Sequence, residues 1–232
     1  METNKKEDIF QRSELLLGAA NMRRLADTRV ILFGLGGVGS WCAEGLLRSG
    51  IGHLTLVDFD RVAASNINRQ LPATGSSIGR MKAEVLRERL LDINPEAEVD
   101  TIEKAYTAES SASFALENYD YILDAIDSLP DKTHLIQTAT RLPGVFFSSM
   151  GAALRMDNTR VRTAEFWKVQ GCPLAAALRH RLKKSGLLPG KKFTCVFSDE
   201  PPMACEGRGS LVQVTATFGF TLAGLVVRDC CR

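Results

Sequence analysis

A glycine-rich loop follows the first strongly apolar segment of the chain. The run VILFGLGGVGSW contains the pattern G-x-G-x-x-G at Gly34, Gly36 and Gly39, with Gly37 inside it. Glycines at this spacing, between a predicted strand and a predicted helix, let phosphate oxygens approach backbone amides at a helix N-terminus. Asp58 ends the next predicted strand, where a carboxylate can accept hydrogen bonds from a ribose. The pattern predicts a nucleotide site without separating NAD from ATP, and tight turns in an ordinary βα unit are the alternative.

The residues that follow Asp58 favour a polyphosphate over a nicotinamide. Within thirteen residues the segment VDFDRVAASNINRQ carries a second carboxylate, amides and a guanidinium, at Asp60, Asn66, Arg69 and Gln70. An arginine can bind a phosphate through two hydrogen bonds and keeps its charge. A carboxylate at the position of Asp60 can hold a magnesium ion bound to phosphate oxygens. Each of these residues, taken alone, could also be an ordinary charge on a solvated loop.

Two further segments place charges where phosphates or magnesium would bind. Lys82, in the run IGRMKAE, lies in the first turn of a predicted helix, where the helix dipole disfavours a cation. We therefore expect an anion beside it. The run YILDAIDSLPDK carries Asp124 and Asp127 at the end of a predicted strand, on the sheet edge shared with the glycine loop. We expect Asp127 to face the nucleotide, with the alternative that one of these acids caps the helix beginning near Ser128.

Short apolar runs alternate with longer amphipathic runs over residues 29–149. This alternation is typical of βαβ units and predicts an α/β fold of the Rossmann-like, doubly wound kind with a mainly parallel sheet. Right-handed crossovers then place the carboxyl ends of the strands along one edge, where ligands bind. The expected strands are Val30–Gly34, His53–Asp58, Ala97–Glu103, Tyr121–Ala125 and Gly144–Ser149, and the expected helices are Val38–Ser49, Gly79–Ile93, Ala108–Leu116 and Pro130–Arg141.

The rest of the chain is expected to form an N-terminal helical arm and a C-terminal extension of strands and helices. The last helix is uncharged but contains polar residues and two glycines, which favours a buried core helix over a membrane span. The expected elements are the arm Asp8–Asp27, strands at Ala152–Met156, Val161–Glu165 and Phe193–Phe197, helices at Cys172–Ser185 and Leu211–Val227, and a surface loop over Leu187–Gly209.

Composition and charge restrict the class of protein. A chain that is 45% hydrophobic and 24% charged is typical of a globular protein and excludes disorder or a coiled coil. Twenty-nine basic and 27 acidic residues give a charge of +2, so any RNA binding requires a local basic patch. The first ten residues lack the apolar segment of a secretory signal, which predicts a cytoplasmic protein without membrane insertion. The six cysteines include no C-x-x-C pair, so we expect free thiols rather than a zinc site or disulfides.

Most of the chain resembles a superfamily of adenylate-forming enzymes. Residues 29–70, followed by IGRMKAEVLRERLLDINPEAEV and YILDAIDS, are similar to the adenylate-forming domain of ThiF, MoeB and ubiquitin-activating enzymes. The resemblance implies that ATP and Mg²⁺ are bound, with Mg²⁺ at Asp60 and Asp127. An arm arginine crosses a dimer interface in this superfamily; Arg12 in FQRSELLLG matches it, so a homodimer is expected. The implied nucleotide-binding positions are Gly34, Gly36, Gly37, Gly39, Asp58, Asp60, Asn66, Arg69, Gln70, Lys82 and Asp127, and the implied catalytic residues are Arg69, Lys82, Asp127 and Arg12.

Several segments resemble one branch of this superfamily, the tRNA threonylcarbamoyladenosine dehydratases. They are CVFSDEPP, GSLVQVTATFGFTLAG, PLAAALRHRLKKSG, and GVGSW with Trp41. The branch lacks the two C-x-x-C pairs of the sulfur-carrier activators, as this chain does. The resemblance implies ATP-dependent dehydration of N6-threonylcarbamoyladenosine in tRNA through carboxylate adenylation, and it adds a cysteine desulfurase or sulfur acceptor to the partners to be tested. We expect one ThiF-type domain over residues 1–232, with a helical arm (1–28), an ATP-binding core (29–150) and a substrate-side extension (151–232).

A tRNA substrate requires a basic surface, which we expect close to the loops on the site side. The candidate residues are Arg179, Arg181, Lys183, Lys184, Lys191 and Lys192, with His180 among them. Phosphate contacts of this kind fix position without reading sequence, and a solvated helix face is the alternative.

Three other functions are compatible with parts of this pattern. The first is adenylation of the C-terminal glycine of a ubiquitin-like sulfur carrier, which the missing zinc cysteines disfavour. An NAD-dependent dehydrogenase offers no role for Arg69 or Lys82. The intact set of ATP-binding residues disfavours an adapter that has kept only the fold.

Overall fold

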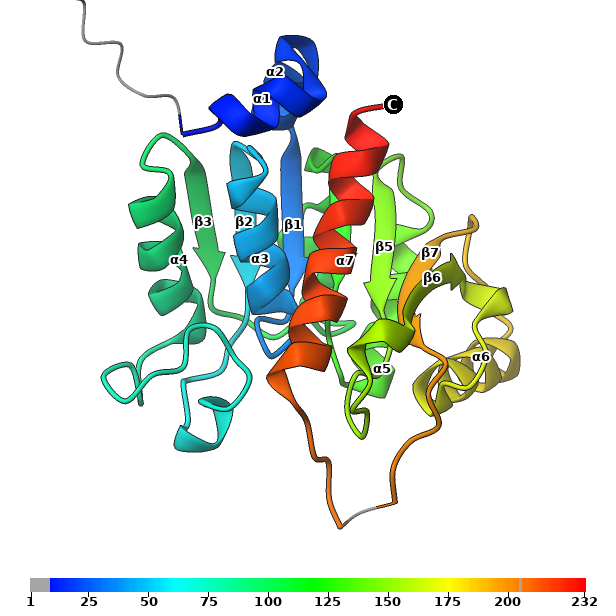
Figure 1. Ribbon diagram of the computed structural model, residues 1–232. Helices are drawn as coiled ribbons and strands as arrows, with labels where there is room; N and C mark the ends of the chain where they lie inside the picture. Colours follow the sequence, from blue (N-terminus) through cyan, green and yellow to red (C-terminus); the bar gives the residue numbers. More distant parts are fainter. Residues whose placement is uncertain (1–8, 205) are drawn as a thin grey trace, which may run out of the picture.

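One seven-stranded sheet forms the centre of the protein (Figure 1). The computed structural model describes residues 9–204 and 206–232. The strand order is β3-β2-β1-β4-β5-β7-β6, and every neighbouring pair is parallel except β6 with β7. The predicted α/β, mainly parallel fold is confirmed. The strands are β1 (Arg29–Phe33), β2 (His53–Val57), β3 (Glu98–Ile102), β4 (Tyr121–Asp124), β5 (Val145–Ser149), β6 (Val161–Glu165) and β7 (Thr194–Ser198).

Helices cover both faces of the sheet. On one face α3 (Gly39–Arg48), α4 (Lys82–Ile93) and α7 (Val212–Cys230) pack on the strands, and on the other α5 (Leu129–Ala139) and α6 (Pro173–Ser185) do so. Because both faces are covered, β1 is apolar at successive positions rather than at alternate ones. The two central strands β1 and β4 are neighbours although they are distant in sequence. The chain adds strands outward in one direction from β1 to β3 and in the opposite direction from β4 onward, so the strand order reverses between β1 and β4. Ligands of open α/β sheets bind at such a reversal.

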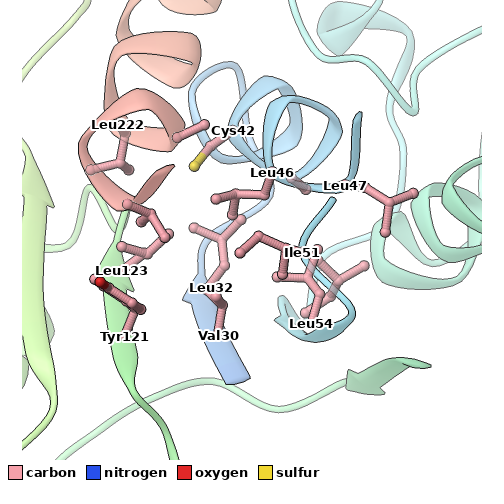
Figure 2. Packing of buried hydrophobic residues seen from close by; sticks show 14 of the residues in the cluster. Val30, Leu32, Cys42, Leu46, Leu47, Ile51, Leu54, Tyr121, Leu123 and Leu222 are labelled. Carbon is pink, nitrogen blue, oxygen red and sulfur yellow. The ribbon is translucent and has the colours of Figure 1, made fainter. Parts of the chain in front are cut away.

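The apolar core divides into two layers, one on each side of the sheet. Figure 2 shows the first layer, in which Val30 and Leu32 of β1 lie beside Leu46 of α3 and Leu222 of α7. Ile31 and the other residues of opposite parity point into the second layer, under α5 and α6. This alternation follows from the two-residue period of a strand.

The N-terminal arm consists of two short helices on the amino edge of the sheet (Figure 1). The helices α1 (Gln11–Leu17) and α2 (Ala19–Asp27) are separated by Gly18, whose φ of 82° a glycine adopts without strain. The expected helical arm is therefore confirmed, with a break. The first part of that expectation, residues 1–8, lies outside the described residues, as does Cys205.

Two expected elements are wrong. Residues 152–156 form turns and irregular structure instead of a strand, because their backbone pairs with the loop that precedes α7: the Leu154 amide donates to the Gly209 carbonyl at 2.8 Å. Residues 108–116 form 3₁₀ turns, η2 (Ser111–Phe114) and the start of η3 (Leu116–Asn118), instead of an α-helix. There the Ser110 hydroxyl donates to the Ala105 carbonyl at 2.7 Å, and such local bonds compete with helix formation.

The C-terminal helix α7 packs in the core, as expected. It lies against α3 so closely that a side chain at Gly219 would come within 2.5 Å of the Val38 carbonyl oxygen. Among the residues that the structure describes, no helix combines the length and apolarity required to cross a bilayer.

Candidate active site

The glycine loop joins β1 to α3 at the carboxyl edge of the sheet. Gly34 has a φ of 85°, and a Cβ there would lie 2.7 Å from the Ala125 carbonyl oxygen. A Cβ at Gly39 would overlap the Gly34 carbonyl oxygen at 1.8 Å. A tight βα turn is therefore enough to explain why these two positions are glycines. The close approach of Gly34 to Ala125 also brings the loop after β4 into contact with the glycine loop.

The two inner glycines have a different environment. A Cβ at Gly36 would meet its nearest neighbour, the Gln70 side chain, at an ordinary contact distance of 3.7 Å, while one at Gly37 would lie 3.1 Å from Thr215. The N-cap of α3 is Val38, whose apolar side chain cannot cap the helix. The backbone at this helix start is therefore suited to bind an anion.

Three charged side chains follow β2 and gather next to the glycine loop. Asp58 is 8% exposed and accepts hydrogen bonds from the amides of Leu35 at 2.6 Å and Asp60 at 2.8 Å. Burial raises the pKa of Asp58, while these amides and the nearby charge of Lys82 oppose the increase. Lys82 is 5% exposed, and its Nζ lies 2.7 Å from the Asp60 carboxylate. The anion expected beside Lys82 is thus Asp60 in this structure.

The segment carrying Arg69 lies between β2 and α4. The Arg69 guanidinium bonds within its own loop, donating from Nη1 to the Ser65 carbonyl at 2.9 Å and to Asn68 Oδ1 at 2.7 Å. Asn66 accepts a backbone amide of the same loop. Gln70 is buried, and its Oε1 has no hydrogen-bond partner among residues 9–204 and 206–232. A buried acceptor of this kind normally has a partner, and a ligand donor at the glycine loop would supply one.

A fully buried ion pair supports the loop after β4. Asp124 and Lys132 are both 0% exposed, with Lys132 Nζ 2.8 Å from the Asp124 carboxylate. The carboxylate also accepts the Ser148 hydroxyl at 2.7 Å and the Ile126 amide at 3.1 Å, and Lys132 donates to the Ile126 carbonyl at 2.9 Å. Asp124 is therefore a structural residue that fixes the loop on which Asp127 is placed.

Sequence reasoning missed Lys132, and the alternative that it left open for the helix cap is wrong. The N-cap of α5 is Ser128, so the alternative that Asp124 or Asp127 caps this helix is wrong. Lys132 shares a helix face with Leu135 and Ile136, which are both fully buried. A lysine at the i position of such an apolar i, i+3, i+4 set signals a buried partner.

Asp127 contrasts with Asp124 because its side chain is 91% exposed. Its carboxylate lies 3.9 Å from Nη1 of Arg208, which is itself 80% exposed. Arg208 belongs to the segment between β7 and α7 and was not among the expected site residues. An exposed pair at this distance is weak, so both side chains can turn to other partners.

Arg12 lies far from these residues within one chain. It is exposed on α1, which covers the amino edge of the sheet, whereas the glycine loop lies at the carboxyl edge (Figure 1). The structure thus places Asp58, Asp60 and Lys82 next to the glycine loop and leaves Arg12 at the opposite end of the chain's fold.

The basic candidates for RNA binding do not form one surface beside the site. Lys191 and Lys192 precede β7, which is parallel to β5, so they must lie at the amino edge. Lys191 donates there to the Gly144 carbonyl at 2.6 Å, which makes the expected position near the site-side loops wrong for these two. Arg179 donates to the carbonyls of Phe166 and Val169. The exposed members on α6 are His180, Arg181, Lys183 and Lys184. The helix ends beside the last turn of α5, where Gln137 donates to the Leu187 carbonyl at 2.9 Å, so Lys183 and Lys184 also lie toward the amino edge rather than beside the site.

A glycine loop, a carboxylate after β2 and a lysine opening α4, on the carboxyl edge of a parallel sheet, define a nucleotide-binding α/β protein. The chain belongs to the ThiF family, whose model matches residues 10–231. It is similar to the tRNA threonylcarbamoyladenosine dehydratase of Bacillus subtilis (strain 168), with 40% identity over 194 residues, which are 84% of this chain and 76% of that protein. It is also 37% identical over 232 residues to the enzyme of that name from Escherichia coli (strain K12), covering 88% and 87% of the two chains.

Among solved structures, the chain is again similar to a tRNA threonylcarbamoyladenosine dehydratase. The crystal structure of E. coli tRNA N6-threonylcarbamoyladenosine dehydratase, TcdA, in complex with ATP superposes with a TM-score of 0.91 at 35% identity, over 99% of this chain and 96% of that one. Similarity to the molybdopterin-synthase adenylyltransferase of Escherichia coli (strain K12) is 33% over 135 residues and covers 57% of this chain. E. coli MccB with ATP, at 17% identity and a TM-score of 0.67, shares the fold alone.

Proposed function

We propose that this protein is an ATP-dependent enzyme that dehydrates N6-threonylcarbamoyladenosine in tRNA. The observation that carries the proposal is the near-complete match, at 35% identity, to a dehydratase crystallised with ATP. The matches to adenylyltransferases are weaker: two are 33% identical, and they cover either 57% of this chain or, where 92% of it is covered, only 43% of the relative. The rival reading, adenylation of a ubiquitin-like carrier protein, is therefore less well supported.

The chemistry that follows is activation of a carboxylate. An oxygen of the threonyl carboxylate attacks the α-phosphorus of ATP, the bond to pyrophosphate breaks, and an acyl-adenylate forms. A nitrogen or oxygen of the same modified base then attacks the acyl carbon, a proton is lost from an N–H of the same group and AMP is expelled, so that one water is removed overall. Ring closure is intramolecular and requires no protein nucleophile. This agrees with the burial of Cys42, Cys172 and Cys195.

The residues gathered at the carboxyl edge are assigned to the nucleotide. The amides of the glycine loop and the start of α3 bind phosphate oxygens, and Asp58 accepts the ribose hydroxyls. Lys82 and Arg69 neutralise charge as the α-phosphate is attacked. For this, Lys82 exchanges the Asp60 carboxylate, 2.7 Å away, for a phosphate, and Arg69 turns from its own loop. Asn66 and Gln70 hold the same segment against the ligand.

Magnesium fits Asp127 better than Asp60. Mg²⁺ on a nucleotide is held through one or two protein carboxylates together with phosphate oxygens and water. Asp127 offers an exposed carboxylate on the loop that touches the glycine loop, whereas Asp60 already pairs with Lys82. When bound, the ion neutralises phosphate charge and favours departure of pyrophosphate.

The remaining assignments concern assembly and RNA. We assign residues 1–28 to a dimer arm, 29–150 to ATP binding and 151–232 to the substrate side of a single domain in a cytoplasmic homodimer. Arg12 of one chain then serves the site of the other, which explains its position on the amino edge. Exposed Arg181, Lys183 and Lys184 on α6 are assigned to tRNA phosphates. A cysteine desulfurase or sulfur acceptor is the further partner to test.

One experiment separates the proposal from its rival. The protein is incubated with ATP, Mg²⁺ and either threonylcarbamoylated or hypomodified tRNA, and the nucleosides are analysed by mass spectrometry. We expect loss of one water only from the modified tRNA, with one AMP released per product. Pyrophosphate exchange that depends on a small carrier protein, with the tRNA unchanged, would overturn the proposal in favour of the rival.

A further inference from the structure

Two adjacent side chains at the start of α3 connect the glycine loop to the segment that carries Arg69. The indole of Trp41 donates from Nε1 to the Arg69 carbonyl at 3.0 Å. The hydroxyl of Ser40 donates to the Gly36 carbonyl at 2.7 Å and accepts the Leu71 amide at 3.1 Å. These bonds join residues that are 28 and 31 positions apart in sequence, so they are tertiary contacts and not local turns.

The bonded atoms lie on both sides of Gln70. The Arg69 carbonyl precedes it and the Leu71 amide follows it, so the backbone of this residue is fixed from both directions. The Gln70 side chain in turn lies beside Gly36, with Nε2 3.7 Å from the position of a Cβ there. The distance between the glycine loop and the Arg69 segment therefore depends on Ser40 and Trp41.

The indole of Trp41 is held in place by α7. Its ring lies 5.9 Å from that of Phe220, at an interplanar angle of 58°. On the same helix, a Cβ at Gly219 would lie 2.8 Å from Trp41 Cβ, so the two backbones approach closely at this point. Side chains packed in this way keep one rotamer, which makes the direction of the Nε1 donor a fixed feature of the fold.

We infer that Trp41, with Ser40, is a positioning residue for nucleotide binding: it holds the Arg69 segment at the distance from the glycine loop that a polyphosphate requires. The inference rests on the proposed function. Trp41 acts through the Arg69 backbone and is not assigned a contact with ATP. A misplaced charged group loses much of its effect on a phosphate, because the benefit of preorganised donors depends on their geometry.

The test compares ATP affinities in a double-mutant cycle. Trp41→Phe retains a ring against Phe220 but removes the Nε1 donor, and Arg69→Ala removes the charged group. The dissociation constant for ATP with Mg²⁺ is measured by calorimetry for both variants and for their combination. We expect Trp41→Phe to weaken binding about fivefold, which corresponds to the loss of one hydrogen bond. In the Arg69→Ala background it should have no further effect.

The chain offers a matched control, because it contains only one other tryptophan. Trp167 is 38% exposed and lies in η5 (Phe166–Lys168), directly after β6, so Trp167→Phe should leave ATP affinity unchanged. In that variant Trp41 is the sole tryptophan, and its fluorescence should change when ATP is added. Ser40→Ala removes the bonds to the Gly36 carbonyl and the Leu71 amide and should weaken ATP binding by a similar factor.

The outcomes distinguish the inference from the function on which it rests. If Arg69→Ala weakens ATP binding but Trp41→Phe does not, the positioning role is wrong and the nucleotide site stands. If the effects of the two variants simply add, Trp41 does not act through the Arg69 segment. If neither variant changes ATP affinity, the assignment of Arg69 to the phosphates is itself overturned. Melting temperatures of all variants identify any loss that reflects unfolding.

Discussion

Charged side chains differ in burial between the inner half of the sheet, around β1, β2 and β4, and the outer half, around β6 and β7. At the carboxyl ends of β1, β2 and β4 several charged groups are buried: Lys82 is 5% exposed, and the Asp124–Lys132 pair is completely enclosed. Beside β6 and β7 the paired charges are more exposed, as in Arg162 with Asp199, whose side chains are 56% and 31% exposed. The two halves differ in solvation, although both belong to one sheet.

This difference matches two kinds of task. Groups that stabilise charge during a reaction must already be in position, which requires burial and a complete hydrogen-bond network. Groups that receive a large nucleic acid can stay solvated and rearrange, since contacts to phosphates tolerate small shifts. We conclude that the inner half is built for the nucleotide and the outer half is left adaptable for the substrate.

The largest effect is expected at the buried pair of the inner half. Lys132→Met leaves the Asp124 carboxylate without its counter-charge and should lower the free energy of unfolding by about 3–5 kcal/mol. Urea unfolding at neutral pH measures this loss. Adding Asp124→Asn should restore part of it, because no uncompensated charge then remains. The control Lys192→Met, on the outer surface, should be neutral. If Lys132→Met and the wild type were equally stable, the buried pair would contribute nothing to stability, and the difference between the two halves of the sheet would be wrong.

The next largest effect concerns activity without loss of fold. Lys82→Ala and Arg69→Ala should each lower the rate of dehydration by at least about a hundredfold, because each removes a charge that faces the developing phosphate charge. AMP release measures the rate, and circular dichroism verifies the fold. Arg61→Ala is the matched control, since this exposed arginine of the same region bonds the Gly79 carbonyl. Wild-type rates in both test variants would contradict our assignment of the phosphate site.

A smaller effect, dependent on pH, is expected at Glu44 on α3. Burial raises the pKa of this carboxyl group, but hydrogen bonds from Arg89 and Arg48 outweigh it and leave the pKa below its ordinary value of 4.5. The charged form is therefore stabilised by folding, and this stability is present above pH 4.5 and is lost as the pH falls through the lowered pKa.

Glu44→Gln should consequently cost about 1 kcal/mol at pH 7, a modest value because both arginines are half-exposed and screened by water. Unfolding in urea at pH 7 and at decreasing pH below 4.5 measures the difference from the wild type. That difference should shrink as the pH falls. A difference that is constant with pH would show that the charge of Glu44 contributes nothing.

The smallest effect is expected in the outer half. Arg208→Ala should leave the melting temperature and the ATP affinity unchanged, because its pair with Asp127 is exposed and long. Differential scanning calorimetry and ATP titration measure both quantities. A clear loss of stability would mean that the segment before α7 is as preorganised as the glycine loop, and the comparison of the two halves would no longer hold.

Much of the inner half could be predicted from the residues. The five strands expected there all exist, and each end lies within one residue of the expected one. Short apolar runs of this length, bounded by glycines and polar turns, rarely form anything other than a buried strand. The helix expected at 108–116 failed because Ser110 and its neighbours bond the local backbone. The strand expected at 152–156 failed because that backbone pairs with a loop more than forty residues later, a contact that no local pattern contains.

The sequence by itself determined the layered α/β fold, the glycine loop at its switch point and the types of charged residue that follow β2 and β4. It did so because strand and helix periods and glycine spacing are local properties of the chain. Only the tertiary structure decided which charges are buried: Asp124 with Lys132 inside, Asp127 outside, and Lys191 at the amino edge. Burial depends on which segments pack together, and that is settled by the whole fold.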